Sequence, residues 1–115
     1  MEAGAFSPPS LSFVVSAVLV SPLVEEVAFR GMILQSLMRG TAFWVSNSVT
    51  AVLFLLYHLP LWVARGHGAS VLGSLWILLF ALFLGICLRR TRSLWTCIAI
   101  HATQNLIFGV MLTVR

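Results

Sequence analysis

The sequence predicts an all-α protein: a polytopic transmembrane helical bundle with four core helices. Hydrophobic residues make up 60% of the 115 residues and charged residues only 9%, whereas soluble domains carry about 25% charged residues. The apolar residues form four continuous runs, while membrane strands would show alternating apolar and polar positions. Each run is close to the ~20 residues that a helix needs to cross a bilayer.

The first apolar run covers residues 11–38, and as a helix it would extend roughly 42 Å, beyond the hydrocarbon core of about 30 Å. Pro22 divides this run. It either kinks a single helix or takes the first position of a new helix that Ser21 caps. Both alternatives predict irregular backbone one turn before Glu25. Residues 1–10 are expected to form an N-terminal tail, and residues 11–115 the membrane-embedded core.

The three other helices are expected at residues 41–59, 71–88 and 94–114. The second should end before Pro60, because proline lacks the amide that continues a helix. A polar, glycine-containing loop is expected at about residues 64–70. The loop Arg89-Arg90-Thr91-Arg92 should separate the third helix from the fourth.

The formal net charge of +4 comes from arginine, since the chain has no lysine. All arginines except Arg30 lie at the ends of apolar runs, which is typical of membrane topology signals and not of a nucleic-acid-binding stripe. The expected surroundings are therefore a lipid bilayer, with no nucleic acid partner. One face holds Arg39, Arg89, Arg90 and Arg92, and the other holds Arg65 and Arg115. By the positive-inside rule the first face is cytoplasmic, and both termini lie outside.

Two adjacent acids interrupt the first apolar run, and an ionisable residue at membrane depth marks a candidate functional site. Glu26 lies four residues before Arg30, so the two can pair on one helical face as a structural ion pair. Glu25 is turned by about 100° from Glu26 and has no cation at helical spacing. An unpaired carboxylate in a low-dielectric site holds a proton more readily than in water, which suits a general base.

Two further polar clusters lie in the second and fourth runs. Phe54 and His58 share one face of the second helix, and His101 and Asn105 share one face of the fourth. Gly109 continues the latter face, where a small residue would let another helix or a substrate approach closely.

Folding of the bundle could bring Glu25, His58, His101 and Asn105 around one cavity. The predicted helix ends argue against direct contact, because His58 would lie about 25 Å from the arginine-rich face and His101 about 10 Å. Helix tilt, shifted boundaries or a fourth helix that begins deeper would close this gap.

The clusters read EEVAFR, FLLYH and HATQN in chain order. They resemble the signature of the CPBP family, also called the CAAX protease and bacteriocin-processing family or Abi family: E-E-x-x-x-R, F-x-x-x-H and H-x-x-x-N on successive core helices. The preceding Ser-Pro-Leu-Val and the following Gly31 fit as well. The resemblance implies a glutamate-dependent intramembrane endopeptidase like the type II CAAX prenyl endopeptidases. Its implied catalytic residues are Glu25, His58, His101 and Asn105, and its implied supporting residues are Glu26, Arg30 and Phe54.

Two mechanisms fit these residues. In the first, Glu25 and His58 activate a water, and His101 and Asn105 stabilise the oxyanion, so that no cofactor is required. In the second, Glu25, His58 and His101 bind Zn²⁺. We favour the metal-free mechanism, because the chain lacks an H-E-x-x-H motif.

The expected substrate is a membrane-embedded or lipid-modified peptide or protein, and the expected location is the plasma membrane of a prokaryote. Characterised members of the family usually carry additional spanning helices, so this chain resembles their four-helix core. The alternative is a non-catalytic membrane protein of the same fold, such as an immunity factor against a peptide toxin. An ion or proton carrier is disfavoured, because both intramembrane acids lie at one level.

Overall fold

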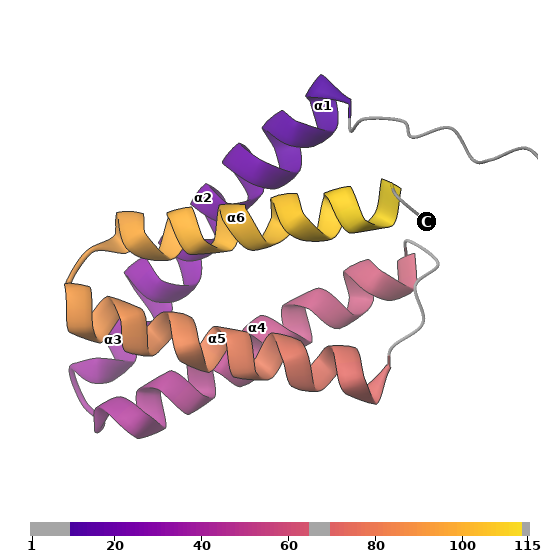
Figure 1. Ribbon diagram of the computed structural model, residues 1–115. Helices are drawn as coiled ribbons and strands as arrows, with labels where there is room; N and C mark the ends of the chain where they lie inside the picture. The colour runs from indigo at the N-terminus through magenta and orange to yellow at the C-terminus, as the bar shows by residue number, and fades with distance from the viewer. Residues whose placement is uncertain (1–9, 65–69, 114–115) are drawn as a thin grey trace, which may run out of the picture.

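The computed structural model describes residues 10–64 and 70–113, and every regular element in these ranges is a helix (Figure 1). Four helices there are long and apolar enough to cross a membrane: Leu11–Met38, Phe43–Ala64, Val71–Thr91 and Leu94–Met111. The predicted all-α class with four core helices is confirmed. The tail up to residue 9, residues 65–69 of the predicted loop with Arg65, and Arg115 lie outside the described residues.

The first spanning helix is continuous but changes its hydrogen-bond register along its length. It comprises α1 (Leu11–Phe13), η1 (Val14–Val20), α2 (Ser21–Glu26), η2 (Val27–Ile33) and α3 (Leu34–Met38). The two η segments are π-helical, so that the Ser21 amide bonds to the Ser16 carbonyl, five residues back. Ser21 itself has helical angles, φ −61° and ψ −50°. The alternative in which Ser21 caps a new helix is therefore wrong, whereas the irregular backbone that both alternatives predicted before Glu25 is present as a π-helical stretch.

The second spanning helix, α4 (Phe43–Ala64), contains Pro60 instead of ending before it. The expected boundary at residue 59 is thus wrong. Proline removes one backbone hydrogen bond, whereas ending the helix in hydrocarbon would leave several backbone groups without partners. Continuation of the helix is the smaller cost.

The third spanning helix, α5 (Val71–Thr91), extends three residues beyond the expected end at residue 88 and takes in Arg89 and Arg90. It stops at Arg92, whose φ of 54° is left-handed and whose amide bonds to the Leu88 carbonyl. Arginines in a last helical turn interact favourably with the helix dipole, which explains the extension. The fourth helix, α6 (Leu94–Thr113), begins where the sequence predicted.

Helices α4 and α5 pack closely through small and polar side chains. The buried Asn47 of α4 donates from Nδ2 to the Leu82 carbonyl of α5 at 3.1 Å. A Cβ atom on Gly85 would collide with the Asn47 side chain, so glycine is required at this approach. α6 contacts α5 on one side and the first helix on the other (Figure 1).

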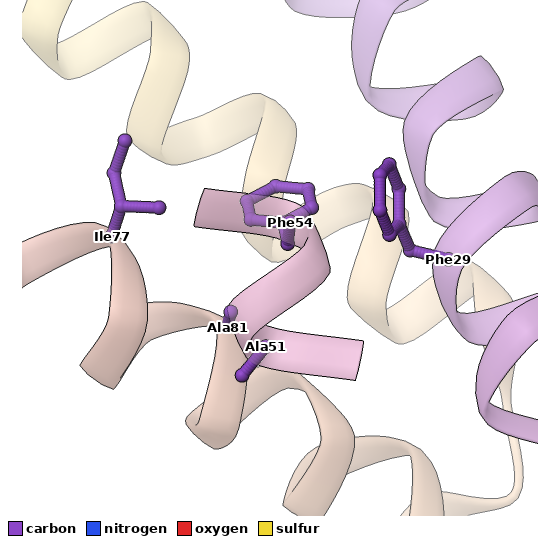
Figure 2. Packing of buried hydrophobic residues seen from close by; sticks show 5 residues of the cluster. All are labelled: Phe29, Ala51, Phe54, Ile77 and Ala81. Carbon is purple, nitrogen blue, oxygen red and sulfur yellow. The ribbon is translucent and has the colours of Figure 1, made fainter. Parts of the chain in front are cut away.

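A small apolar core forms around Phe54 (Figure 2). Its buried members are Phe29, Ala51, Phe54, Ile77 and Ala81. The Phe29 and Phe54 rings meet edge to face with their centroids 5.0 Å apart. Because these residues come from the first helix, α4 and α5, this core holds three of the four spanning helices together beside the polar clusters.

Candidate active site

Glu26 is fully buried and joins two basic side chains. Its Oε1 accepts from Arg30 Nη1 at 3.1 Å and lies 2.7 Å from His101 Nδ1. Arg30, also fully buried, donates from Nη2 to the Ala81 carbonyl at 2.9 Å. The predicted pair between Glu26 and Arg30 is confirmed. Its link to His101 on α6 was not predicted, because spacing along one helix says nothing about a partner on another.

The Glu25 carboxylate has two different environments. Its Oε1 accepts from the Ser21 hydroxyl at 3.0 Å. Its Oε2 lies 3.3 Å from His101 Nε2 and 3.9 Å from His58 Nε2. Both contacts are within ion-pair range, but Oε2 is buried and has no aligned hydrogen-bond donor among the described residues. The Ser21 contact was also not predicted, although its spacing of four residues from Glu25 is a signal that the sequence contains.

Neighbouring acceptors orient both imidazole rings. His58 Nδ1 lies 2.8 Å from the Phe54 carbonyl oxygen, which only accepts, so Nδ1 carries the hydrogen. His101 Nδ1 makes its contact with the Glu26 carboxylate, which is likewise an acceptor because it is paired with Arg30. In both rings, therefore, Nε2 is the atom that faces Glu25.

Phe54 lies at the centre of these polar groups. The Arg30 guanidinium carbon lies 4.5 Å from the centroid of its ring, a distance suited to a cation–π interaction. The His58 and His101 ring centroids are 4.3 and 5.8 Å away. Phe54 is 2% exposed, so it shields this charged cluster on one side with an apolar surface.

Asn105 does not join the cluster directly. Its Nδ2 donates to the backbone carbonyl of Ala17 in η1 at 2.8 Å. One turn further along α6, a Cβ on Gly109 would lie 2.5 Å from the Phe13 ring, so the small residue lets another helix approach. The structure thus brings Glu25, His58 and His101 together and leaves Asn105 one turn away.

The argument that His58 and His101 differ too much in depth for a shared contact is wrong, since both rings approach the same oxygen of Glu25. The observed starts of α4 and α6 lie close to the predicted ones, so shifted helix boundaries do not explain why the two rings meet. Instead, α4 runs obliquely to α6, and the first helix crosses the bundle at an angle (Figure 1). Distance along a helix axis is a poor measure of depth when the axes are not parallel.

An apolar groove of about 610 Å³ lies between α5 and α6, close to this cluster. Its lining residues are Trp76, Leu79, Phe80, Phe83, Ile100, Thr103, Gln104, Ile107 and Phe108. Phe80 also meets the His101 ring edge to face, with their centroids 5.9 Å apart. Phe80 therefore borders the groove and also contacts the His101 ring of the charged cluster.

No group of three or more His, Cys, Asp or Glu side chains in residues 10–64 and 70–113 is arranged to hold a metal ion. The zinc alternative, with Glu25, His58 and His101 as ligands, predicts stoichiometric zinc in active purified protein.

Fold and site together define an integral membrane protein that buries an acid–imidazole cluster among its spanning helices. The family model for type II CAAX prenyl endopeptidase Rce1-like proteins matches residues 7–107. The chain belongs to this family of intramembrane proteases, which confirms the resemblance of its three motifs. Comparisons with curated proteins and with solved structures found no match.

Proposed function

We propose that this protein is an intramembrane endopeptidase that hydrolyses a peptide bond in a membrane-embedded or lipid-modified peptide or protein, with Glu25 as the general base. The observation that carries the proposal is the position of Glu25 Oε2, which is buried between two imidazole Nε2 atoms and has no aligned hydrogen-bond donor in the described part of the chain. We expect the membrane to be the plasma membrane of a prokaryote.

The nucleophile in this proposal is a water molecule between Glu25 and His58. The 3.9 Å between Glu25 Oε2 and His58 Nε2 is too long for a direct hydrogen bond. It suits a water that donates one hydrogen to each atom and turns its lone pairs to the substrate carbonyl. Glu25 accepts the proton as the new C–O bond forms. It then returns the proton to the leaving nitrogen as the C–N bond breaks.

His101 is proposed to stabilise the oxyanion from the other side of Glu25. A donor at this point must be Nε2–H, since Nδ1 is held by Glu26. Asn105 uses one amide hydrogen for Ala17, and its second is proposed as a further donor to the oxyanion.

The test compares the wild type with Glu25→Gln in lipid vesicles that contain candidate membrane peptides and lipid-modified peptides. Removal of a general base typically costs about 10²–10⁴-fold in rate. We therefore expect cleavage to fall by at least a hundredfold, while the amount of folded, inserted protein is unchanged. Gln35→Ala, which alters an exposed polar side chain of the same spanning helix, is the control and should cleave normally.

Full cleavage by Glu25→Gln would refute the assigned base. If neither protein cleaves any peptide, protection of host cells against a peptide toxin becomes the informative assay. Equal protection by both proteins would favour the non-catalytic immunity function.

A further inference from the structure

The hydrogen bond between Asn105 and Ala17 has an unusual origin, because a carbonyl inside a helix normally bonds to an amide of the same helix. Two amides could reach the Ala17 carbonyl: that of residue 21 in an α-helix, or that of residue 22 in a π-helix. The Ser21 amide bonds instead to the Ser16 carbonyl. Residue 22 is proline, which has no amide hydrogen. The Ala17 carbonyl is therefore released from its own helix, and Asn105 of α6 occupies it at 2.8 Å.

We propose that Pro22 and Asn105 together form a positioning device for the active site. Pro22 releases the Ala17 carbonyl, and the bond from Asn105 then fixes the register of α6 against the first helix. His101 lies one turn from Asn105 on the same face, so this register sets its position between Glu25 and Glu26. Pro22 is thus a positioning residue, and its effect on cleavage rests on the proposed function.

Three contacts at successive turns of α6 show this antiparallel register. Gly109 lies against Phe13, Asn105 bonds to Ala17, and His101 contacts both glutamates of α2. A slip of one residue would move His101 by about 1.5 Å along the axis and turn it by about 100°. Such a slip would break the 2.7 Å contact between His101 Nδ1 and Glu26.

Hydrocarbon surroundings strengthen the coupling between the two residues. A backbone carbonyl without a partner is costly where no water can replace the lost donor. The Ala17 carbonyl and the Asn105 side-chain amide therefore form a hydrogen bond with each other, and a shift of α6 along the first helix would break this bond.

The first test is a double-mutant cycle on folding stability in mixed micelles, which needs no substrate. Asn105→Leu keeps roughly the side-chain volume and removes the donor. We expect it to lower the folding equilibrium constant about threefold to tenfold, the range seen for hydrogen bonds between membrane helices. In a Pro22→Ala background the loss should be about twofold or less, because an amide at position 22 or 21 can now bond to the Ala17 carbonyl. Equal losses in both backgrounds would overturn the proposal.

A proline in another helix provides the matched control. Pro60 lies in α4 and its substitution also restores an amide. In a Pro60→Ala background, Asn105→Leu should cost as much as in the wild type. A reduced cost there as well would show a general effect of proline removal and would also overturn the proposal.

The second test measures cleavage per folded molecule, which a purely structural role would not change. Misplacement of a catalytic group by about 1 Å can cost about a hundredfold in rate. We expect Pro22→Ala to lower kcat roughly tenfold or more with KM within about twofold, and Pro60→Ala to leave both unchanged. An unchanged kcat in Pro22→Ala would refute the positioning role. Absence of cleavage by the wild type would instead refute the proposed function, and the stability cycle would still decide whether the two residues are coupled.

Discussion

Replacement of Glu26 by glutamine isolates the contribution of the buried ion pair. Glu26→Gln keeps the shape of the side chain but removes its negative charge. The Arg30 side chain, 0% exposed, would then be a buried cation whose closest partners among the described residues are neutral: the amide oxygen of the new glutamine, the Ala81 carbonyl and the Phe54 ring. Breaking one side of a buried ion pair costs about 3–5 kcal/mol, a large part of the ~5–15 kcal/mol that stabilises a typical fold.

The expected loss in the folding equilibrium constant is therefore roughly a hundredfold to several thousandfold. Reversible unfolding in mixed micelles would measure it. Glu25→Gln is the matched comparison and should cost much less, because Glu25 has no arginine partner within the described residues.

The double variant Glu26→Gln with Arg30→Met removes both charges and should recover most of the lost stability, since no charge is left unpaired. Its cleavage activity should stay low, because His101 loses the carboxylate that orients its ring. The reasoning is refuted if Glu26→Gln costs less than about 1 kcal/mol, the level of an exposed pair. It is also refuted if the double variant loses as much folding free energy as Glu26→Gln and Arg30→Met lose separately when their losses are summed.

Three further predictions concern the base, the helix packing and the metal. Ser21→Ala should lower the cleavage rate severalfold with little change in stability, because Glu25 Oε1 loses its donor, and Ser21→Thr should retain the rate. Gly85→Ala should destabilise the fold by about 1–3 kcal/mol in the same unfolding assay, since the added methyl group collides with Asn47. Treatment with a chelator should leave cleavage unchanged, whereas stoichiometric zinc whose removal stops cleavage would establish the zinc mechanism.

Local patterns in the sequence predicted a large part of the fold. Four helices, the α6 start and the pair between Glu26 and Arg30 all depend on composition or on spacing within one helix. The ends of α4 and α5 were predicted less well. In a protein surrounded by water, proline and arginine commonly mark the end of an apolar helix. Here the surrounding hydrocarbon favours continuation of α4 through Pro60, and the helix dipole favours continuation of α5 through Arg89.

The sequence by itself determined which side chains share a face of each helix, because 3.6 residues per turn is a property of the local backbone. Only the tertiary structure decided which faces meet and at what level. The contacts of His101 with both glutamates depend on helix crossing and register. The bond from Asn105 to Ala17 further requires a π-helical stretch and the missing amide of Pro22. These features arise from interactions between helices that lie far apart in the chain, so no local pattern contains them.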